Sequence, residues 1–491
     1  MSVAHLVLAD RYRDSVALLA VSAALAGRTG VEAVSVVMGT AANLERLAEA
    51  GLGEVTAGPG DLVVAVRAVD DPEARAAVAA AQELLAAPGP SRGPGADATA
   101  EPARSLVAAV TADPALSLAV ISVPGPFAAA EATKALRLGL HVLLFSDNVS
   151  VADEVRLKQE ADRLGLLVMG PDCGTAIVAG VPLGFANVVR RGPVGVVGAS
   201  GTGMQEVTTR LHRAGTGVSH ALGVGGRDLS AAVGGRSTLA ALEVLGADPA
   251  TEVIVLISKP PDPAVADRVL AAATALGRPV VACVLGGDPG RLRAAGVIPA
   301  ATLADAADLA AALVAGRPVV ASGPAPLPAA VHPSAGPGRA TVRGAFCGGT
   351  FAHEAELLLG AAGVAHVVVD YGDDEYTVGR PHPMIDPALR DAAVAAALED
   401  PTTAVVVVDV VLGHGSASDP IGGLLTAVGD ARSRASRPAV PVVAHVCGTD
   451  DDPLGRGGVV AALEAAGVAV AEANAEAVAW AVALVTPGVR P

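Results

Sequence analysis

Aromatic residues are almost missing from this 491-residue sequence, which contains five Phe, three Tyr and one Trp. Hydrophobic residues nevertheless make up 52% of the chain. The cores must therefore be built from Ala, Val and Leu, whose small side chains suit closely packed parallel sheets and helices. A chain of this length has room for roughly three domains, each with its own core.

Positive charge is also scarce, because 34 Lys and Arg face 50 Asp and Glu and give a net charge of −16. Proteins that bind nucleic acid need an excess of Lys and Arg to meet the phosphate backbone, and no basic run is present. The composition therefore argues against a nucleic-acid partner. Small anions can still bind at individual helix N-termini.

Cysteine is sparse, with Cys173, Cys283, Cys347 and Cys447 spread singly along the chain. With no C-x-x-C pair and such wide spacing, the sequence suggests neither a zinc knuckle nor a disulfide framework. These features favour the reducing cytoplasm. No run of about 20 apolar residues is free of Gly, Pro or charge, so we predict no membrane span.

Short β-branched runs alternate with Ala- and Leu-rich segments from Leu116 onward, at a spacing typical of parallel βαβ units. This pattern predicts an α/β fold with three Rossmann- or flavodoxin-like domains, each a doubly wound parallel sheet. The Pro- and Gly-rich composition of two segments predicts a mobile loop in the first domain and an interdomain linker. The expected ranges are 1–190 with the loop 88–103, 191–318, the linker 319–339 and 340–491.

Two glycine-containing turns open the second and third domains alike. "GASGTG" at 198–203 and "FCGGT" at 346–350 each follow a predicted strand and begin a predicted helix. Each turn alone is explained as a tight connection capped by a hydroxyl. As a pair, the two helix N-termini can present N–H groups and positive dipole ends to one phosphate or carboxylate. We predict that Ser200, Gly201 and Thr202 lie on one side of this anion, and Gly348, Gly349 and Thr350 on the other.

Longer motifs resemble known families. "VISVPGPFAAAEATKAL", "FSDNVSVADEVRLK", "GPDCGT", "ASGTGMQE" and "GVGGRDLS" are similar to the α-subunit superfamily of succinyl-CoA synthetase. "YRDSVALL", "MGTAANLERL", "YGDDEYTVGRPHPMIDP" and "VVVDVVLGHGSASDP" resemble the FdrA family of acyl-CoA-synthetase-like proteins over nearly the whole chain. The resemblance implies a CoA-binding-like Rossmann domain followed by two flavodoxin-like ligase domains. It also points to oxamate carbamoyltransferase of anaerobic allantoin breakdown, in which an FdrA-type chain works with two other subunits.

The sequence departs from that superfamily where its chemistry is carried. Succinyl-CoA synthetase relays a phosphoryl group through a histidine in a Gly-His-Ala-Gly core, and the corresponding positions here read Arg293-Ala294-Ala295-Gly296. Lys259 stands where a carboxylate would orient that histidine. A P-loop and the glycine-rich turn expected near the start of the CoA-binding domain are also missing. A phosphate bound here must therefore arrive already activated, as in carbamoyl phosphate.

Three residues are the predicted catalytic groups. Lys259 follows an apolar strand in a chain with only three lysines, and can neutralise a leaving phosphate. Arg380 and His382 lie in a proline-rich loop that restricts their directions. Arg380 can grip a carboxylate, and His382 can hydrogen-bond the carbamoyl oxygen or move a proton. Without a catalytic role, Lys259 is simply a surface lysine at the end of a strand, and Arg380 and His382 lie in a solvated surface loop.

Four further residues are predicted to line the site, because each lies on a turn after an apolar run. Arg227 and Asp228 follow a glycine pair, Asn148 ends a strand, and Cys173 lies in "GPDCGT". Asn148 can instead simply end its strand, and Cys173 can serve only for packing. We assign Cys173 no nucleophilic role.

We therefore expect a cytoplasmic carbamoyltransferase subunit that needs no cofactor or metal. Its ligands are carbamoyl phosphate and a small amide or carboxylate, its partners are two further subunits, and a homo-oligomer is compatible with the sequence. One alternative is an acyl-CoA ligase that binds CoA. Another is a non-catalytic scaffold or ligand sensor, in which the loop of Arg380 and His382 points away from the paired helix ends.

Overall fold

The computed structural model describes residues 1–11, 13, 15–26, 28–86, 103–318, 326–328, 339–377, 381–434 and 439–486. Contacts divide the chain into two units, Met1–Arg104 with Thr377–Pro381, and Ser105–Tyr376 with His382–Pro491. Nearly all of the predicted loop 88–103, most of the predicted linker 319–339 and Arg380 lie outside the described residues.

The first unit is built on a three-stranded antiparallel sheet of order β1-β3-β2. Central β3 pairs with β1 from Ser2↔Ala68 to Leu8↔Leu62. Helices α1 and α3 pack Leu18, Leu25 and Ala77 on one face of the sheet, and Leu47 of α2 packs on the other. The elements are β1 (Ser2–Leu8), α1 (Ser15–Ala26), β2 (Val31–Met38), α2 (Ala41–Glu49), β3 (Leu62–Ala68) and α3 (Asp71–Ala86).

This unit corrects the predicted domain 1–190. A Rossmann domain requires parallel strands, whereas both strand pairs in residues 1–104 are antiparallel. The sequence shows an alternation of strands and helices, but strand direction depends on pairing that the local sequence does not encode. The CoA-binding-like Rossmann domain that was expected to begin at residue 1 therefore does not include this unit.

The second unit begins with a small parallel sheet of order β4-β5-β6. Helices α5 and α6 supply Ala128, Ala132 and Leu157 to its core. Its elements are α4 (Leu106–Ala112), β4 (Leu118–Ile121), α5 (Gly125–Arg137), β5 (His141–Leu144), α6 (Val151–Leu164) and β6 (Val168–Met169).

A seven-stranded sheet of order β13-β12-β11-β9-β10-β7-β8 follows. Strands β9 to β13 are parallel, and the β7–β8 hairpin is joined to β10 by an antiparallel pairing. Because β7 and β8 belong to this sheet, the boundary predicted at residue 190 differs from the structure. The strands are β7 (Thr175–Val178), β8 (Val181–Gly184), β9 (Arg191–Gly198), β10 (Val218–Gly223), β11 (Val253–Ser258), β12 (Val280–Val284) and β13 (Ile298–Pro299).

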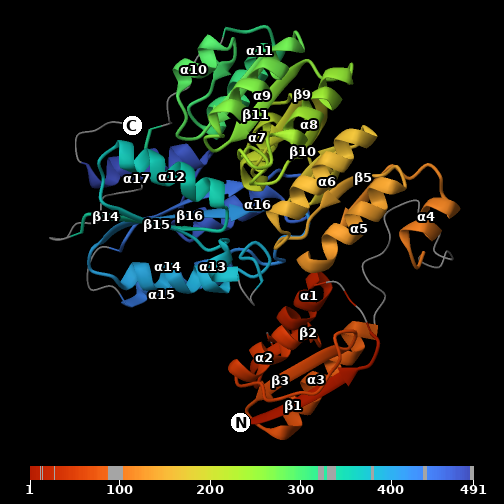
Figure 1. Ribbon diagram of the computed structural model, residues 1–491. Helices are drawn as coiled ribbons and strands as arrows, with labels where there is room; N and C mark the ends of the chain where they lie inside the picture. Colours follow the sequence, from red (N-terminus) through yellow and green to blue (C-terminus); the bar gives the residue numbers. More distant parts are fainter. Residues whose placement is uncertain are drawn as a thin grey trace. The chain divides into compact units, whose positions relative to one another are not determined.

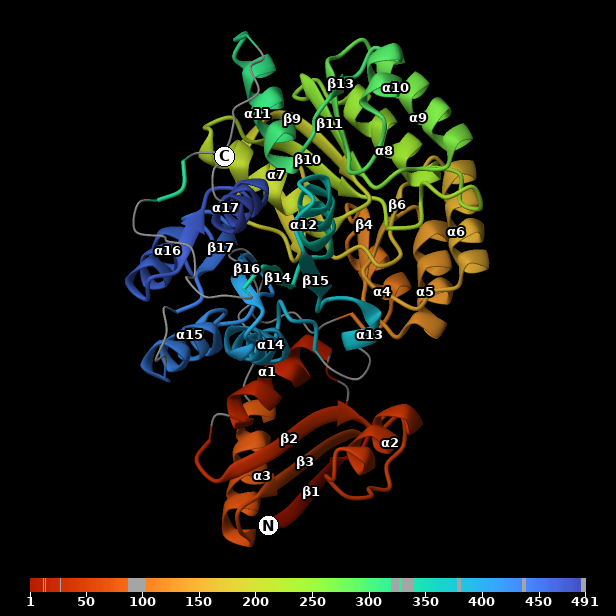
Figure 2. The ribbon, with the colours of Figure 1, turned by 90° about the vertical axis from the view of Figure 1, so that its left-hand side faces the viewer.

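Helices cover both faces of this sheet (Figure 2). Helices α7 and α11 pack on one face, where Met204 and Leu303 are buried. Helices α8 and α9 pack on the other face through Leu242 and Val269. The helices are α7 (Gly201–Arg213), α8 (Arg236–Ala247), α9 (Pro263–Ala275), α10 (Pro289–Ala294) and α11 (Leu303–Val314).

The last sheet is parallel, with the order β15-β14-β16-β17-β18. All nine residues of valine-rich β16 are buried, as expected for a strand covered on both faces. The strands are β14 (Thr341–Phe346), β15 (His366–Asp370), β16 (Thr403–Val411), β17 (Val442–Cys447) and β18 (Ala469–Ala471).

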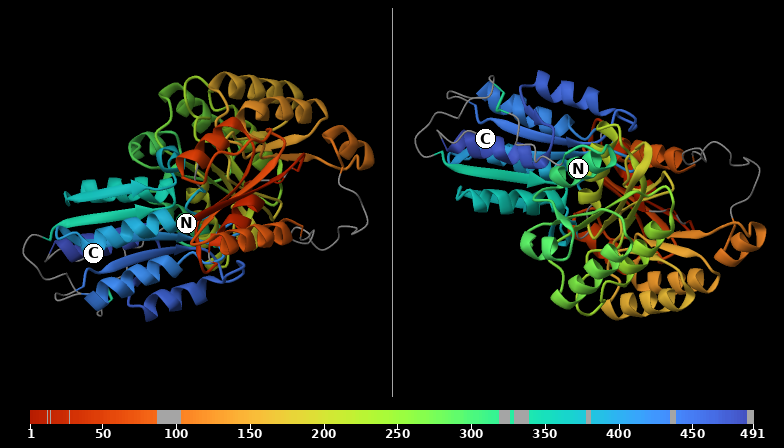
Figure 3. Two further views of the ribbon diagram at one scale, coloured as in Figure 1. Left: turned by 90° about the horizontal axis from the view of Figure 1, so that it is seen from below. Right: turned by 90° about the horizontal axis from the view of Figure 1, so that it is seen from above.

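Helices α12 and α17 cover one face of this sheet, and α14 and α15 cover the other (Figures 1 and 3). The helices are α12 (Gly349–Ala361), α13 (Asp374–Thr377), α14 (Ala388–Glu399), α15 (Gly422–Arg434), α16 (Arg456–Ala465) and α17 (Asn474–Val485). The predicted α/β class is confirmed, with two large doubly wound lobes. We call them the seven-stranded lobe (175–314) and the five-stranded lobe (341–485).

Candidate active site

The turn after β9 begins helix α7 with a local cap. Ser200 has an extended backbone, and its Oγ accepts a hydrogen bond from the N–H of Gly203 at 3.1 Å. A methyl group at Gly203 would lie 3.1 Å from Ile257 Cγ2 and 3.2 Å from Thr350 Cγ2. The glycine therefore permits a close approach between this helix and the five-stranded lobe.

The turn after β14 begins helix α12 without a side-chain cap of its own, because its N-cap is Gly348. The carboxylate of Asp409, from the neighbouring strand β16, accepts hydrogen bonds from the N–H groups of Cys347 at 2.6 Å and Gly348 at 2.8 Å. Asp409 is fully buried. A tertiary contact thus satisfies N–H groups at this helix start that glycine cannot cap, although burial raises the pKa of Asp409.

The two turns meet, as the sequence predicted. Ser200 Oγ and Thr350 Oγ1 are hydrogen-bonded to each other. A methyl group at Gly348 would lie 2.9 Å from Thr202 Cγ2. Each turn also lies where strand order reverses in its sheet, between β9 and β11 and between β14 and β16. Open α/β sheets bind ligands at such points, so the meeting turns define the candidate site.

Two acidic residues missed in the sequence analysis lie at the α12 side of this site. Asp409 is one, and Asp370, at the end of β15, lies against Gly349. Burial raises the pKa of Asp370 to about 6, nearby carboxylates add to the rise, and Lys259 opposes it. The signal available in the sequence was an Asp within or at the end of a valine run, in "VVVD" and "VVVVDVV".

Of the three predicted catalytic residues, the structure places His382 close to one of the turns. His382 Nε2 and the Cys347 carbonyl oxygen would lie 2.6 Å and 2.7 Å from a methyl group at Gly372, so the ring lies near the start of α12. Lys259 has an exposed side chain whose charge acts on Asp370. Arg380 lies outside the described residues.

The contacts of His382 define its chemistry. Its Nδ1 accepts a hydrogen bond from the Met384 N–H at 3.2 Å, so the neutral ring carries its proton on Nε2. Burial lowers the pKa of His382 to about 4. Near neutral pH the ring is therefore uncharged and suited to donating a hydrogen bond from Nε2.

Asp228 does not line the site, which corrects the prediction. Its buried carboxylate accepts hydrogen bonds from the Thr238 N–H at 2.9 Å and from Lys158 Nζ at 2.8 Å. It therefore stabilises the start of α8 and a buried ion pair. Neighbouring Arg227 donates to Glu154 Oε2 at 3.0 Å, which ties this loop to α6.

Cys173 and Asn148 each have a structural role that needs no ligand. Cys173 is 3% exposed, and burial raises the pKa of its thiol to about 12, so it packs in the interior and is not available to a ligand. Asn148 is exposed after β5 in the small sheet, with a φ of 53°. Asn tolerates this left-handed conformation, so the residue fits the reading in which it ends its strand.

Arg390 holds the backbone of the strand that carries Asp409, and no sequence motif predicted this role. Its fully buried guanidinium donates to the carbonyl oxygens of Asp409 at 2.8 Å and Pro420 at 2.9 Å, and to Asp391 Oδ1 at 2.6 Å. These bonds fix the strand that carries the Asp409 carboxylate.

Two buried glutamates, one from each lobe, each form a hydrogen bond with a residue of the other lobe. Each lies six residues after the N-cap of its helix, Glu206 on α7 and Glu354 on α12. Glu206 Oε2 is 2.7 Å from His445 Nε2 of the five-stranded lobe. Glu354 Oε1 accepts from the Leu303 N–H of the seven-stranded lobe at 2.8 Å. The helices that begin at the site are thus held across the interface.

Glu206 and His445 also form, with Cys447, a fully buried set whose ligand atoms lie within 4.8 Å of one another. The direct hydrogen bond between Glu206 and His445 accounts for this proximity without an ion. Within the described ranges, no helix combines the length and apolar character that crossing a membrane requires.

Three family models match the chain. The model "AllF, heavy metal-associated domain" matches residues 1–102, which form the antiparallel unit. The "CoA binding domain" model matches 189–286, where the sequence analysis placed a ligase domain. The "CoA-ligase" model matches 345–484, in the five-stranded lobe. Fold and matches define an α/β protein that contains CoA-binding and CoA-ligase domains.

Relatives define the family more closely. "Uncharacterized protein YahF" of Escherichia coli (strain K12) is 39% identical over 484 residues, covering 92% of each chain. The chain therefore belongs to the FdrA/AllF family. The succinate–CoA ligase [ADP-forming] α subunit of Methanothermobacter thermautotrophicus is 28% identical over 40% of this chain and 70% of its own length.

Among solved structures, acetyl-coenzyme A synthetase 1 of Ca. Korarchaeum cryptofilum is 17% identical, with a TM-score of 0.35 over 75% of this chain and 82% of that chain.

Proposed function

We propose that the chain is a subunit of a carbamoyltransferase that moves a carbamoyl group between carbamoyl phosphate and oxamate. The observation that carries the proposal is the meeting of the α7 and α12 N-termini at Ser200 and Thr350. The corresponding loop, 286–298, contains no histidine that could relay a phosphoryl group. Membership of the FdrA/AllF family and the AllF domain match support a role in allantoin-derived nitrogen metabolism.

The proposed reaction needs no protein nucleophile. The amide nitrogen of oxamate attacks the carbamoyl carbon, the bond to the phosphate oxygen breaks, and phosphate leaves with the electron pair. The helix N-termini and the Lys259 ammonium neutralise that phosphate. Nε2–H of His382 donates to the carbamoyl oxygen, and ionised Asp370 accepts the proton from the attacking nitrogen.

The test is to assay the purified chain, alone and with the products of its neighbouring genes, with carbamoyl phosphate and oxamate. We expect release of inorganic phosphate and formation of oxalurate in equal amounts. Absence of both products from the full complex would reject the proposal.

An acid–CoA ligase is the second candidate, favoured by the CoA-binding and CoA-ligase matches. It predicts thioester formation from ATP, CoA and a dicarboxylic acid in the same preparation. Against a non-catalytic sensor, we note that His382 lies near the start of α12 rather than away from it.

A further inference from the structure

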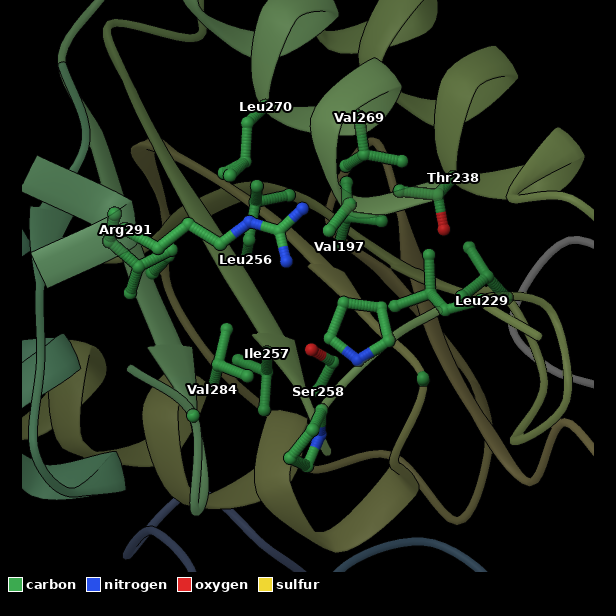
Figure 4. Close-up of a pocket in the computed structure, with 18 of the residues that line it drawn as sticks. Val197, Leu229, Thr238, Leu256, Ile257, Ser258, Val269, Leu270, Val284 and Arg291 are labelled. Atoms are coloured by element: carbon green, nitrogen blue, oxygen red, sulfur yellow. The ribbon is translucent and has the colours of Figure 1, made fainter. Parts of the chain in front are cut away.

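A cavity lies in the seven-stranded lobe and includes one residue of the turn 198–203, Ala199, in its wall. It has a volume of about 150 Å³ and opens at the carboxyl ends of β9, β11 and β12, between the sheet and α9 and α10. Aliphatic side chains form most of its wall (Figure 4). They include Val197, Leu229, Leu256, Val269, Leu270 and Val284.

The cavity occupies the α8/α9 face of the sheet, whereas α7 covers the opposite face. Ile257 is shared, since it lines the cavity and also lies 3.1 Å from a methyl group placed at Gly203. The same reversal of strand order, between β9 and β11, therefore serves two separate places, one on each face.

Four polar side chains line this apolar space, from Thr238, Ser258, Asp288 and Arg291. The Thr238 hydroxyl already donates to Asp228, and Asp288 Oδ1 accepts from the Gly290 N–H, which leaves Ser258 and Arg291 as the donors for a ligand. The Ser258 hydroxyl points into the cavity, and the Arg291 side chain extends across it from α10 (Figure 4). Both hydrogen bonds that Arg291 makes to described residues use Nη2, to Pro263 O at 2.5 Å and to Asp267 Oδ1 at 2.6 Å. Nε and Nη1 are left to face a ligand, and the Asp267 partner is 73% exposed, which makes that ion pair weak.

We propose that this cavity binds a small aliphatic monocarboxylate of about five carbons. The hydrocarbon part fills the aliphatic wall, and Arg291 holds the carboxylate through Nε and Nη1, with Ser258 as a further donor. An apolar cavity of about 150 Å³ is large enough to hold benzene, so a five-carbon chain fits. The proposal is independent of the carbamoyl transfer reaction.

The aliphatic lining disfavours binding of oxamate or carbamoyl phosphate in this cavity. Oxamate and carbamoyl phosphate carry polar atoms on every side, and burying such atoms against aliphatic walls leaves them without hydrogen bonds. A monocarboxylate places its polar atoms at one end only, which matches a cavity with one guanidinium.

The experiment compares 3-methylbutanoate, its neutral amide 3-methylbutanamide and oxamate by calorimetry and ligand-observed NMR on the full chain. We expect the carboxylate to bind at least about tenfold more tightly than the amide, and oxamate not to compete. Arg291→Gln should weaken carboxylate binding by at least about tenfold. Arg293→Gln, an exposed neighbour on the same short helix, is the matched control and should retain wild-type affinity.

A second pair of variants tests the volume. Ala266→Leu on α9 adds carbon atoms at the cavity wall and should abolish binding of both the acid and the amide. Ala271→Leu, exposed on the same helix, should leave binding intact. Equal affinity for acid and amide, equal effects of the two arginine variants, or no binding to the folded wild-type chain would overturn the proposal, whatever the transferase assay gives.

Discussion

The seven-stranded and five-stranded lobes repeat one strand–turn–helix segment but stabilise it by different means. Helix α7 is capped by its own Ser200, whereas the start of α12 is satisfied by Asp409 from another strand. Both helices carry a glutamate at the same distance from the N-cap. The comparison shows that one backbone arrangement can depend on a local side chain in one lobe and on tertiary packing in the other.

The two glutamates differ in charge as well. Burial opposes ionisation of Glu206, but His445, Arg213 and Arg210 outweigh it, so its pKa is lowered. Burial raises the pKa of Glu354 to about 7 and Glu206 adds to the rise, while the N–H groups of Leu303 and Asn474, together with His445, oppose it only in part. Near neutral pH Glu206 is therefore ionised, whereas Glu354 is close to the midpoint of its titration.

The largest expected effect comes from Glu206. Glu206→Gln at pH 7 should lower the free energy of unfolding by at least about 3 kcal/mol, because it removes a carboxylate from a fully buried hydrogen bond with His445. Chemical denaturation measures this loss, and Glu252→Gln, exposed in the same lobe, is the control. A loss equal to that of the control would show that the pair does not hold the lobes.

The raised pKa of Glu354 should make the stability of the folded chain depend on pH. Its folded pKa of about 7 lies above the ordinary glutamate value of 4.5, so the folded chain binds more protons and loses stability as pH rises from 4.5 to 7. The loss at higher pH is about 3 kcal/mol. Denaturation at pH 5 and pH 8 should show it in the wild type and in Glu356→Gln, and not in Glu354→Gln.

Removing the Asp409 carboxylate tests whether the start of α12 depends on tertiary contacts more than the start of α7 depends on Ser200. Asp409→Ala deletes two hydrogen bonds to a buried carboxylate and should cost about 3 kcal/mol of unfolding free energy. The cost is measured by denaturation at constant pH. A loss no larger than that of Ser200→Ala would mean that the two caps are equivalent.

His382→Ala tests the proposed donor near the start of α12. Carbamoyl transfer should fall about a hundredfold, since a hydrogen bond to the developing oxyanion is lost, while the unfolding midpoint changes little. Because the ring is neutral above a pKa of about 4, His382 itself adds no pH dependence between pH 6 and 8, and the rise in rate near pH 6 belongs to the ionisation of Asp370. An unchanged rate of phosphate release would remove His382 from the mechanism.

Lys259→Met asks whether the seven-stranded lobe contributes charge to the site. The side chain is exposed, so stability should not change, and phosphate release should fall about tenfold. Lys134→Met, on the exposed surface of α5, is the matched control. Equal rates for the two variants would contradict a role for Lys259.

The smallest effect is expected for the local cap. Ser200→Ala should cost about 1 kcal/mol of unfolding free energy, and Ser200→Gly only a few tenths. Thermal unfolding of the two variants provides the measurement. A cost for alanine similar to that expected for Asp409→Ala would erase the distinction between the lobes.

The sequence predicted the parts of the fold that depend on local pattern. Valine runs such as Thr403–Val411 and glycine turns at 198–203 and 346–350 identified strands and helix starts. It failed where strand direction matters, since residues 1–104 form an antiparallel unit. Residues such as Asp409 and Arg390 act through partners far away in the chain, so no local motif identified them.

Composition and periodicity thus determined the α/β class, the alanine- and valine-rich cores and the two turns, because these depend on side-chain size and spacing along the chain. Only the tertiary structure decided that the turns meet, that Asp409 caps α12, and that Asp228 and Cys173 are buried away from ligands. These outcomes depend on which strands pair and which helix ends face each other, and the free energy that fixes them comes from contacts between distant segments.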